Sequence, residues 1–406
     1  MARPLGIGIV GTGQRCMFFF APYLLAHPEK VRLECLADQD QARLQSAIED
    51  LGRDIRPYGS IDAMLQDPLV DAVIITTPDW THRQIFDKAL DAGKHVICEK
   101  PMATTLEDAL HMTRRAMAAQ QVVQIGFMLR YAPFFVKLKE VVDSGLIGPL
   151  VQVSAAEVVE YYHGAAFFRR WHRFKRNSGG LLVHKACHTL DVINWIVGSA
   201  PAQVSAFGGI NTFTPNPKAA SRCRDCSLRP TCPAAYRPDD YNYVYQTGQE
   251  RAAQAKHAND LCAYNSEKDS VDSAVLIAQY DSGVRLGFSF STTGQRHERQ
   301  LLLIGQRGQI RASQADGVIT VEPVGEKPET TLLPEELRGE HGGGDDFLVD
   351  SFLECVATGS RPVAGVVAGL HSVALGAAAT QSIDQGGCAV DLRQLQAELS
   401  RHPDGE

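Results

Sequence analysis

The stretch "LGIGIVGTGQR", Leu5 to Arg15, decides the fold, because a short aliphatic run passes directly into a glycine-rich turn. Gly11 permits a tight turn, and Gly13 lets a pyrophosphate approach the backbone at the start of the helix expected from about Arg15. Cys16 occupies the third position of the usual G-x-G-x-x-G pattern, so the motif is incomplete and weak evidence when taken alone. It predicts a dinucleotide site, which the flanking sequence has to support.

A second aliphatic run, "VRLECLAD", ends at Asp38, where a carboxylate can accept hydrogen bonds from both ribose hydroxyls of a dinucleotide. The same charge would repel a 2′-phosphate, and Gln39 and Asp40 follow it in place of an arginine. The pattern therefore favours NAD over NADP. The alternative is that Asp38 only caps the next helix.

Strand and helix patterns then alternate through "DAVIITTP", "HRQIFDKALDAG" and "HVICEKP", which predicts a doubly wound parallel sheet. Ligands bind such sheets at the carboxyl ends of the strands. The loops Thr76–His82 and Cys98–Pro101 follow two of these ends, and Lys100 is expected to face the crevice unless it is a solvated surface lysine. The predicted cofactor-binding residues are Gly11, Gly13, Gln14, Arg15, Asp38, Thr77, Pro78, His82, Glu99 and Lys100.

The composition limits the partners of the chain. Its 406 residues are enough for two domains, and a formal charge of -7 gives no general attraction to nucleic acid or anionic lipid. No signal peptide or membrane-spanning run is visible in the sequence. We therefore expect a small-molecule partner, no nucleic acid and no membrane. With ten cysteines, we expect a reducing cytoplasm.

The residues "GTG", Asp38, "TTPDWTH" and "EKP", followed by "GFMLRY" at Gly126–Tyr131, resemble the Gfo/Idh/MocA family of nicotinamide-dependent sugar and cyclitol oxidoreductases. The resemblance covers nearly the whole chain. It implies an N-terminal Rossmann domain at 1–130 and a C-terminal α+β domain at 131–406 with a large, mostly antiparallel open sheet. It also implies homodimers or homotetramers, and a lysine at position 100 that contacts substrate and nicotinamide.

The second half of the chain changes to strand alternation in "IGPLVQVSAAEVVEYYH" and to two hairpin patterns, "SAVLIAQYDSGVRLGFSFSTTG" and "RQLLLIGQRGQIRAS". These segments fit an antiparallel sheet. A glycine-rich loop, "HGGGDD", either closes over substrate or begins a helix that Asp345 caps.

The segment "GGLLVHKACHTLDVINWIVG" predicts one helix between Gly179 and Gly198. His184, His188 and Asp191 would share a face, and the neighbouring Lys185 would reach its rim. Three interpretations are open: a zinc site, satisfied core residues, or acid/base chemistry on an alcohol.

The family resemblance favours acid/base chemistry. The family signature G-G-x-x-x-D-x-G-x-H-x-x-D aligns with Gly179 to Asp191, and His188 matches the catalytic histidine. His184 replaces the usual aspartate, and Lys185 differs from the family as well. The resemblance thus implies a catalytic set of Lys100, His188, His184 and Lys185, in which His184 either relays protons or only binds a hydroxyl.

A basic run, "RRWHRFKR" at 169–176, precedes this helix. It is either a solvated surface or a source of arginines that bind an anionic group on the sugar, with Trp171 stacking on the ring. The predicted substrate-binding residues are Tyr161, His163, Arg169, Arg170, Trp171 and His172.

Four cysteines form a second candidate site in an insertion at about 209–262. Cys223, Cys226 and Cys232 in "CRDCSLRPTC", together with Cys262, have spacing that suits a structural zinc ion. Reduced thiols and an iron–sulfur cluster are the alternatives.

These features predict an NAD-dependent oxidoreductase that acts on a secondary hydroxyl of a sugar, glycoside or cyclitol. One alternative is an NAD-dependent glycosidase of the same superfamily, acting on an anionic (sulfonated or carboxylated) sugar, since the surplus histidines and Lys185 would supply an extra acid/base. Another is a non-catalytic binding protein, which the presence of both Lys100 and His188 disfavours.

Overall fold

Six parallel strands form the N-terminal sheet of the computed structural model, which describes residues 3–236, 260–338 and 341–399. The strand order is β3-β2-β1-β4-β5-β6. It reverses between β1 and β4, so the carboxyl ends of these strands flank a crevice. The strands are β1 (Leu5–Val10), β2 (Val31–Ala37), β3 (Arg56–Tyr58), β4 (Ala72–Ile75), β5 (His95–Cys98) and β6 (Val123–Ile125).

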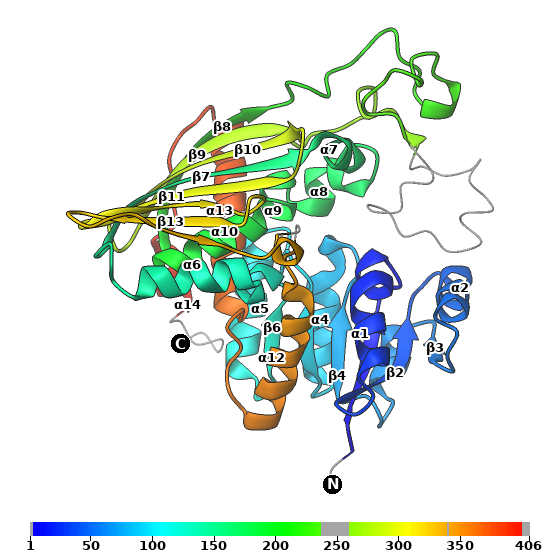
Figure 1. Cartoon of the computed structure of the whole chain (residues 1–406). Coiled ribbons are helices and arrows are strands. Elements are labelled where there is room, and N and C mark those ends of the chain that lie inside the picture. Colours follow the sequence, from blue (N-terminus) through cyan, green and yellow to red (C-terminus); the bar gives the residue numbers. More distant parts are fainter. Residues whose placement is uncertain (1–2, 237–259, 339–340, 400–406) are drawn as a thin grey trace.

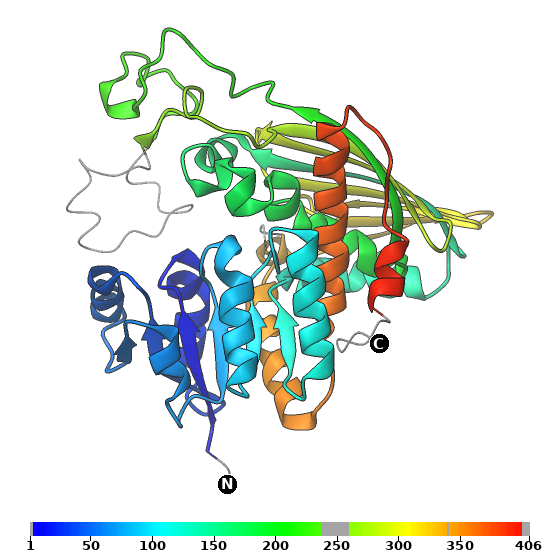
Figure 2. The same ribbon diagram turned by 180° about the vertical axis from the view of Figure 1, so that it is seen from behind.

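Helices cover both faces of this sheet (Figures 1 and 2), which confirms the doubly wound prediction. The helices from its own segment are α1 (Ala21–Ala26), α2 (Gln41–Leu51), α3 (Ile61–Leu65), α4 (His82–Asp91) and α5 (Leu106–Ala118). A π-helical turn, Cys16–Phe20, leads into α1. Helix α12 (Gly344–Thr358), from the far end of the chain, also packs into this core through Leu348 and Phe352.

A nine-stranded sheet forms the second half, in the order β14-β13-β12-β11-β7-β10-β9-β8-β15. All of its neighbouring pairs are antiparallel except β7 and β10, and the predicted hairpins are β9–β10 and β11–β12. The strands are β7 (Leu150–Glu160), β8 (Pro201–Gly209), β9 (Ser273–Tyr280), β10 (Arg285–Gly294), β11 (Glu298–Gly305), β12 (Gly308–Ser313), β13 (Val318–Pro323), β14 (Glu329–Leu332) and β15 (Val390–Asp391). The prediction of a large, mostly antiparallel sheet is confirmed.

Helices cover only one face of this second sheet. α6 (Pro133–Asp143), α10 (Cys187–Val197) and α13 (Val366–Asp384) lie between it and the N-terminal domain (Figures 1 and 2). By length and composition, α13 alone among the described helices could cross a membrane, but it is mostly buried and packs on β8, α5 and α10. The shorter helices are α7 (Tyr161–Phe167), α8 (Lys175–Ser178), α9 (Leu181–His184) and α14 (Gln394–Leu399).

Two local predictions are wrong. The helix expected from Gly179 to Gly198 is broken after His184 into α9 and α10. Asp345 does not cap α12: the N-cap position holds Gly343 at φ 78°, and the Asp345 carboxylate instead forms ion pairs with Arg15 and His341. The centre of the predicted insertion, 237–259, lies outside the described residues.

Candidate active site

A cavity of about 1070 Å³ opens between the carboxyl edge of the N-terminal sheet and the second domain. Residues from both domains line it, so the two halves of the predicted site meet in one space. All ten predicted cofactor-binding residues belong to its lining: Gly11, Gly13, Gln14, Arg15, Asp38, Thr77, Pro78, His82, Glu99 and Lys100.

The glycine turn after β1 is shaped for close approach by a ligand. Gly11 has φ 93°, and a Cβ there would lie 2.9 Å from the backbone nitrogen of Thr77, so this position requires glycine. A Cβ on Gly13 would meet only the Thr76 oxygen, at 3.9 Å, which leaves the backbone open on that side. The turn therefore fits a dinucleotide pyrophosphate, although the third glycine of the motif is missing.

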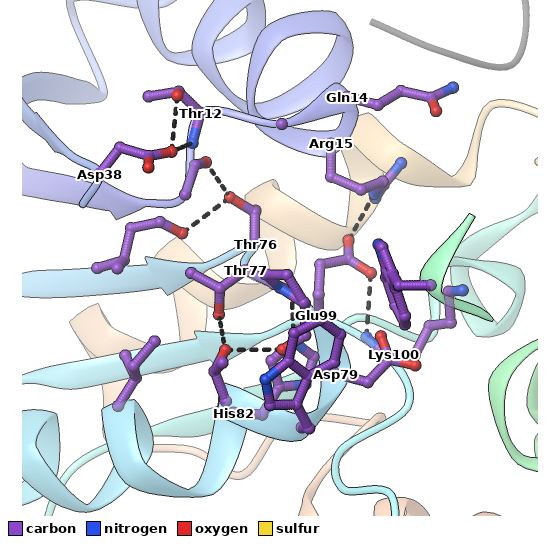
Figure 3. A pocket seen from close by; sticks show the side chains of 18 of the residues that line it. Thr12, Gln14, Arg15, Asp38, Thr76, Thr77, Asp79, His82, Glu99 and Lys100 are labelled. Carbon is purple, nitrogen blue, oxygen red and sulfur yellow. Dashed lines mark hydrogen bonds and ion pairs between the residues drawn. The ribbon is translucent and has the colours of Figure 1, made fainter. Parts of the chain in front are cut away.

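Asp38 is fixed at the cavity wall at the end of β2. Its Oδ2 accepts hydrogen bonds from the Thr12 backbone nitrogen at 2.9 Å and from Thr12 Oγ1 at 2.8 Å (Figure 3). The cap of α2 is Asp40, whose carboxylate accepts from the Arg43 nitrogen. The alternative role of Asp38 as a helix cap is thus excluded. Arg43 also lines the cavity. The sequence analysis, which looked for an arginine only at positions 39 and 40, did not predict this.

A chain of ion pairs ties this end of the cavity to α12. Arg15 Nε lies 2.6 Å from Glu99 Oε1, and Arg15 Nη2 lies 2.7 Å from Asp345 Oδ1 (Figure 3 shows the first pair). His341 Nδ1 is 2.7 Å from the other Asp345 oxygen. Burial raises the pKa of Asp345, but Arg15 and His341 outweigh it and hold that pKa well below its usual range. Arg15 and Asp345 are therefore each held by two charged or titratable partners within the protein.

The predicted catalytic side chains come together across the domain boundary. Lys100, at the end of β5, places its Nζ 3.4 Å from the carbonyl oxygen of His184 on α9. His184, Lys185 and His188 all line the cavity and are buried. On an unbroken helix Lys185 would point about 100° away from His184. In the structure all three side chains border the same cavity.

Asp79 is a functional candidate that the sequence analysis missed. Its Oδ2 lies 2.6 Å from His184 Nδ1, and both side chains are buried. Burial raises the pKa of Asp79 to about 7, against the opposing charges of His82 and Lys100. Burial and the Lys100 charge hold the pKa of His184 well below its usual value. The pair therefore holds one dissociable proton near neutral pH.

Asp79 stood within the quoted loop "TTPDWTH", but nothing local connects it to a histidine 105 positions further along the chain. The only signal in the sequence was the replacement of the family aspartate by His184, which leaves a carboxylate to be supplied from elsewhere.

Two further histidines face the cavity in neutral form. Burial, then the charge of Lys100, lowers the pKa of His188 well below its usual value, and burial, then His184, does the same for His172. Nδ1 of each ring has no hydrogen-bond partner within the described residues. Each can therefore accept a proton or bind a ligand group.

Four of the six predicted substrate-binding residues line the cavity: His163, Arg170, Trp171 and His172. Trp171 stacks on His172 at 3.7 Å and meets Trp80 edge-on at 5.1 Å. Tyr161 and Arg169 are not among the lining residues. The Tyr161 hydroxyl lies 2.9 Å from that of Tyr264, because the predicted strand ends at Glu160 and α7 begins there.

Asp191, which the unbroken helix would have placed beside His184 and His188, is buried in the interior instead. Its two oxygens accept from Arg130 Nε at 2.8 Å and Nη2 at 2.7 Å. This bidentate pair joins α10 to the segment that leaves the N-terminal domain, and Asp191 is structural.

The four cysteines of the insertion border a second, separate cavity of about 30 Å³. The backbone nitrogens of Tyr236 and Ala220 donate to the sulfurs of Cys223 and Cys226, each at 3.4 Å. Within the described residues, however, no three His, Cys, Asp or Glu side chains are grouped so that they could hold a metal ion. The zinc prediction for Cys223, Cys226, Cys232 and Cys262 therefore lacks support from their arrangement.

Comparison with known families gives two matches that together span most of the chain. Residues 5–127 match the oxidoreductase family GFO_IDH_MocA, NAD-binding Rossmann fold. Residues 139–392 match its C-terminal alpha/beta domain.

Individual relatives agree with these matches. The Bacillus subtilis protein YteT is 29% identical over 80% of this chain and 82% of its own length. The scyllo-inositol 2-dehydrogenase (NAD(+)) of the same species is 29% identical over 52% of this chain and 59% of its own length. A levoglucosan dehydrogenase, solved in complex with NADH and levoglucosan, superposes with a TM-score of 0.75 at 17% identity, over 96% of this chain and all of that one, and this likeness shows the fold.

Proposed function

The chain belongs to the Gfo/Idh/MocA oxidoreductase family, and on that premise we propose that it oxidises a secondary hydroxyl of a sugar, glycoside or cyclitol with NAD. The observation that carries the proposal is the convergence of Lys100 from the Rossmann domain with His184 and His188 from the other domain in one cavity. Inositol and levoglucosan dehydrogenases among the similar proteins support this substrate class.

The Gly11 turn and the Asp38 carboxylate would hold the cofactor, with Asp38 accepting from the ribose hydroxyls. Bound NAD supplies the hydride acceptor. The protein then has to bind the alcohol, orient it and remove its proton, which are tasks for the residues at the other end of the cavity.

In the proposed mechanism, His188 takes the hydroxyl proton of the substrate. It is suited to this role because its ring is neutral and its Nδ1 has no partner within the described residues. The Lys100 ammonium would donate a hydrogen bond to the same oxygen. Asp79 and His184, 2.6 Å apart, would accept the proton next or bind a neighbouring hydroxyl. Lys185 lines the same space.

The direct test incubates the purified chain with NAD and a panel of inositols, aldoses, alkyl glycosides and uronates, and follows NADH formation. We expect turnover of at least one member, with a proton released for each NADH formed. If NAD binds but no member of a broad panel is oxidised, the dehydrogenase assignment fails.

A second candidate is the redox-neutral glycosidase, which the Asp79–His184 pair favours because it is an acid/base couple beyond Lys100 and His188. In this route a ring hydroxyl is oxidised to a ketone, a base removes the proton on the adjacent carbon, and the aglycone leaves from the next carbon. Water then adds at that carbon, and the ketone is reduced again. An aryl glycoside distinguishes the two functions, because this route releases phenol without net NADH.

We also propose that a second copy of the chain covers the outer face of the nine-stranded sheet, as a homodimer or within a homotetramer. Phe207, Val275 and Ile277 on β8 and β9 are 62%, 55% and 66% exposed on that face, which is unusual for apolar side chains on neighbouring strands. Light scattering of the purified chain should give a dimer or tetramer mass. Ile277→Lys should lower that mass, whereas Met117→Lys, at an exposed position on α5 in the N-terminal domain, should not.

Structural zinc at the four cysteines stays a proposal as well. The four cysteines border one small cavity, and two of their sulfurs accept backbone N–H hydrogen bonds, but zinc binding would require the thiol side chains to rotate toward one another. Metal analysis should find about one zinc per chain, lost in Cys226→Ala. All ten cysteines are unpaired thiols, which fits the proposed cytoplasmic location.

A further inference from the structure

Arg169 and Arg170, which join α7 to the turn at Trp171, are buried or partly buried arginines, and neither pairs with a carboxylate within the described residues. Arg169 is 2% exposed, and its Nε and Nη2 have no hydrogen-bond acceptor within the described residues. Its guanidinium lies over the ring of Tyr162, 5.5 Å from the centroid. Arg170 lines the cavity, and its described contact is a long one, 3.5 Å from Nε to the carbonyl oxygen of Ala166.

The other buried arginines of the described chain are neutralised. Arg130 pairs with Asp191 at 2.7 Å, and Arg299, which is 1% exposed, pairs with Glu157 at 3.1 Å. Arg15 pairs with both Glu99 and Asp345. A buried guanidinium without a counter-charge is unfavourable. Because Arg169 and Arg170 differ from these paired arginines, we expect a bound anion to neutralise them.

Among the described residues, the surroundings of Arg170 offer no such anion. The other residues at this end of the cavity contribute positive or titratable groups: His163, His172, Lys100 and Lys185. The two acids that line this cavity outside the ribose end are already engaged: Asp79 with His184, and Glu99 with Arg15. Burial, then the charge of Arg169, lowers the pKa of Arg170 to about 10, as expected for an uncompensated guanidinium.

We propose that the substrate carries an anionic substituent, a carboxylate or sulfonate on the sugar, which binds to the guanidinium of Arg170 beside the catalytic groups. The proposal rests on the proposed function. Arginine suits this role because its planar fork donates two parallel hydrogen bonds to two oxygens of one anionic group. His172 lines the same part of the cavity. Arg169, placed behind Arg170, reinforces the positive potential.

The experiment compares three methyl glucosides that differ only at carbon 6: the alcohol, the carboxylate and the sulfonate. With NAD saturating, we expect kcat/KM for at least one anionic member to exceed that of the neutral member by about 100-fold, the value of one or two charge-assisted hydrogen bonds. The carboxylate and sulfonate arms identify which anion the site accepts.

Arg170→Met should remove this preference, because it should lower kcat/KM for the anionic sugar about 100-fold more than for the neutral sugar. Arg170→Lys should restore part of it, since lysine keeps the charge without the fork. The control is Arg176→Met, in the same basic run, whose guanidinium lies over Phe174 and does not line the cavity. It should behave as the wild type.

Equal kcat/KM for neutral and anionic sugars, or equal loss on both in Arg170→Met, overturns the anion site and leaves the dehydrogenase function intact. If no glucoside is oxidised, calorimetric binding of the methyl glucuronide and the sulfonate to the NAD complex replaces turnover. Binding of either that Arg170→Met weakens supports the anion site although the dehydrogenase function has failed, and absence of binding by both overturns the site.

Discussion

The two ends of the active-site cavity differ in how their polar groups are satisfied. At the nucleotide end the side chains pair with one another: Asp38 with Thr12, and Arg15 with Glu99 and Asp345. At the substrate end, Nδ1 of His172 and of His188 has no partner within the described residues, and Arg170 makes one long contact to a backbone oxygen. Apart from Arg15 Nη1, which has no partner within the described residues, these nucleotide-end side chains are engaged, and the first end offers a ligand its backbone turn and one carboxylate. The second end is completed by its ligand, so it is where specificity and proton transfer should be sought.

The largest expected effect comes from the residue that joins the two ends. Lys100→Met should lower kcat by about 10² to 10⁴-fold, because it removes a polar group that contacts the reacting oxygen. The NAD dissociation constant, measured by quenching of protein fluorescence, should change only a few-fold, since the Gly11 turn and Asp38 are untouched.

Lys88→Met is the matched control for this loss. Lys88 lines the same cavity at the nucleotide end, where it pairs with Asp62, and its removal should leave kcat unchanged. Turnover retained within ten-fold in Lys100→Met would contradict the convergence of the two ends on one alcohol.

Asp38→Ala should have the opposite signature. It should weaken NAD binding about 10 to 100-fold through loss of charge-assisted hydrogen bonds, with kcat at saturating NAD nearly unchanged. The neighbouring Asp40→Ala should leave NAD affinity alone and lower the free energy of unfolding by about 1 kcal/mol, since Asp40 caps α2. Similar NAD affinity in the two variants would remove Asp38 from the cofactor site.

A smaller effect is expected at Asp79, which does not contact the alcohol in this mechanism and acts through His184. Asp79→Asn should lower kcat about ten-fold and remove the titration near pH 7 from the pH–rate profile, since that proton is shared with His184. A merely structural role would change kcat at every pH equally. Asp79→Glu, which keeps the carboxylate, should retain the titration.

The same contrast explains how far the sequence could predict the molecule. The nucleotide end depends on local patterns, such as a strand followed by glycines and a carboxylate at the end of the next strand, and all ten residues predicted there line the cavity. At the substrate end the result depended on features that no local pattern encodes. One tertiary contact holds Asp191 in the interior against Arg130, and another brought Asp79 to His184.

The family signature nevertheless predicted which segment would reach the cavity, because His184, Lys185 and His188 all line it. The arginines of the basic run at 169–176 lie in different environments, which the number of positive charges in the run does not predict. Arg170 faces the cavity, Arg169 is buried behind it, and Arg173 donates to the backbone carbonyl oxygens of Arg170 and Glu267. Burial of each side chain is set by the packing of α7 and the following turn, which involves residues distant in sequence.

The smallest effect concerns stability, and it too should originate at the substrate end. His172, His184 and His188 have folded-state pKa values below the unfolded value of about 6.5 because of burial. Each of these histidines binds a proton less readily in the folded protein than in the unfolded one. Its contribution to the free energy of unfolding is therefore complete above about pH 6.5, and it is lost as the pH falls below that value, by up to about 1.4 kcal/mol per pH unit for each group.

Asp79 works in the opposite direction. Its folded pKa, raised to about 7, exceeds the unfolded value of about 3.9, so its contribution is present at low pH and lost as the pH rises through 7. Asp79→Asn removes this opposing contribution. Urea unfolding between about pH 5 and 7 should therefore show a steeper loss of stability on acidification in Asp79→Asn than in the wild type, and a shallower one in His172→Gln. If the free energy of unfolding depends on pH in the same way in all three proteins, these buried groups do not determine the loss of stability on acidification. The substrate end would then not differ from the nucleotide end in this respect.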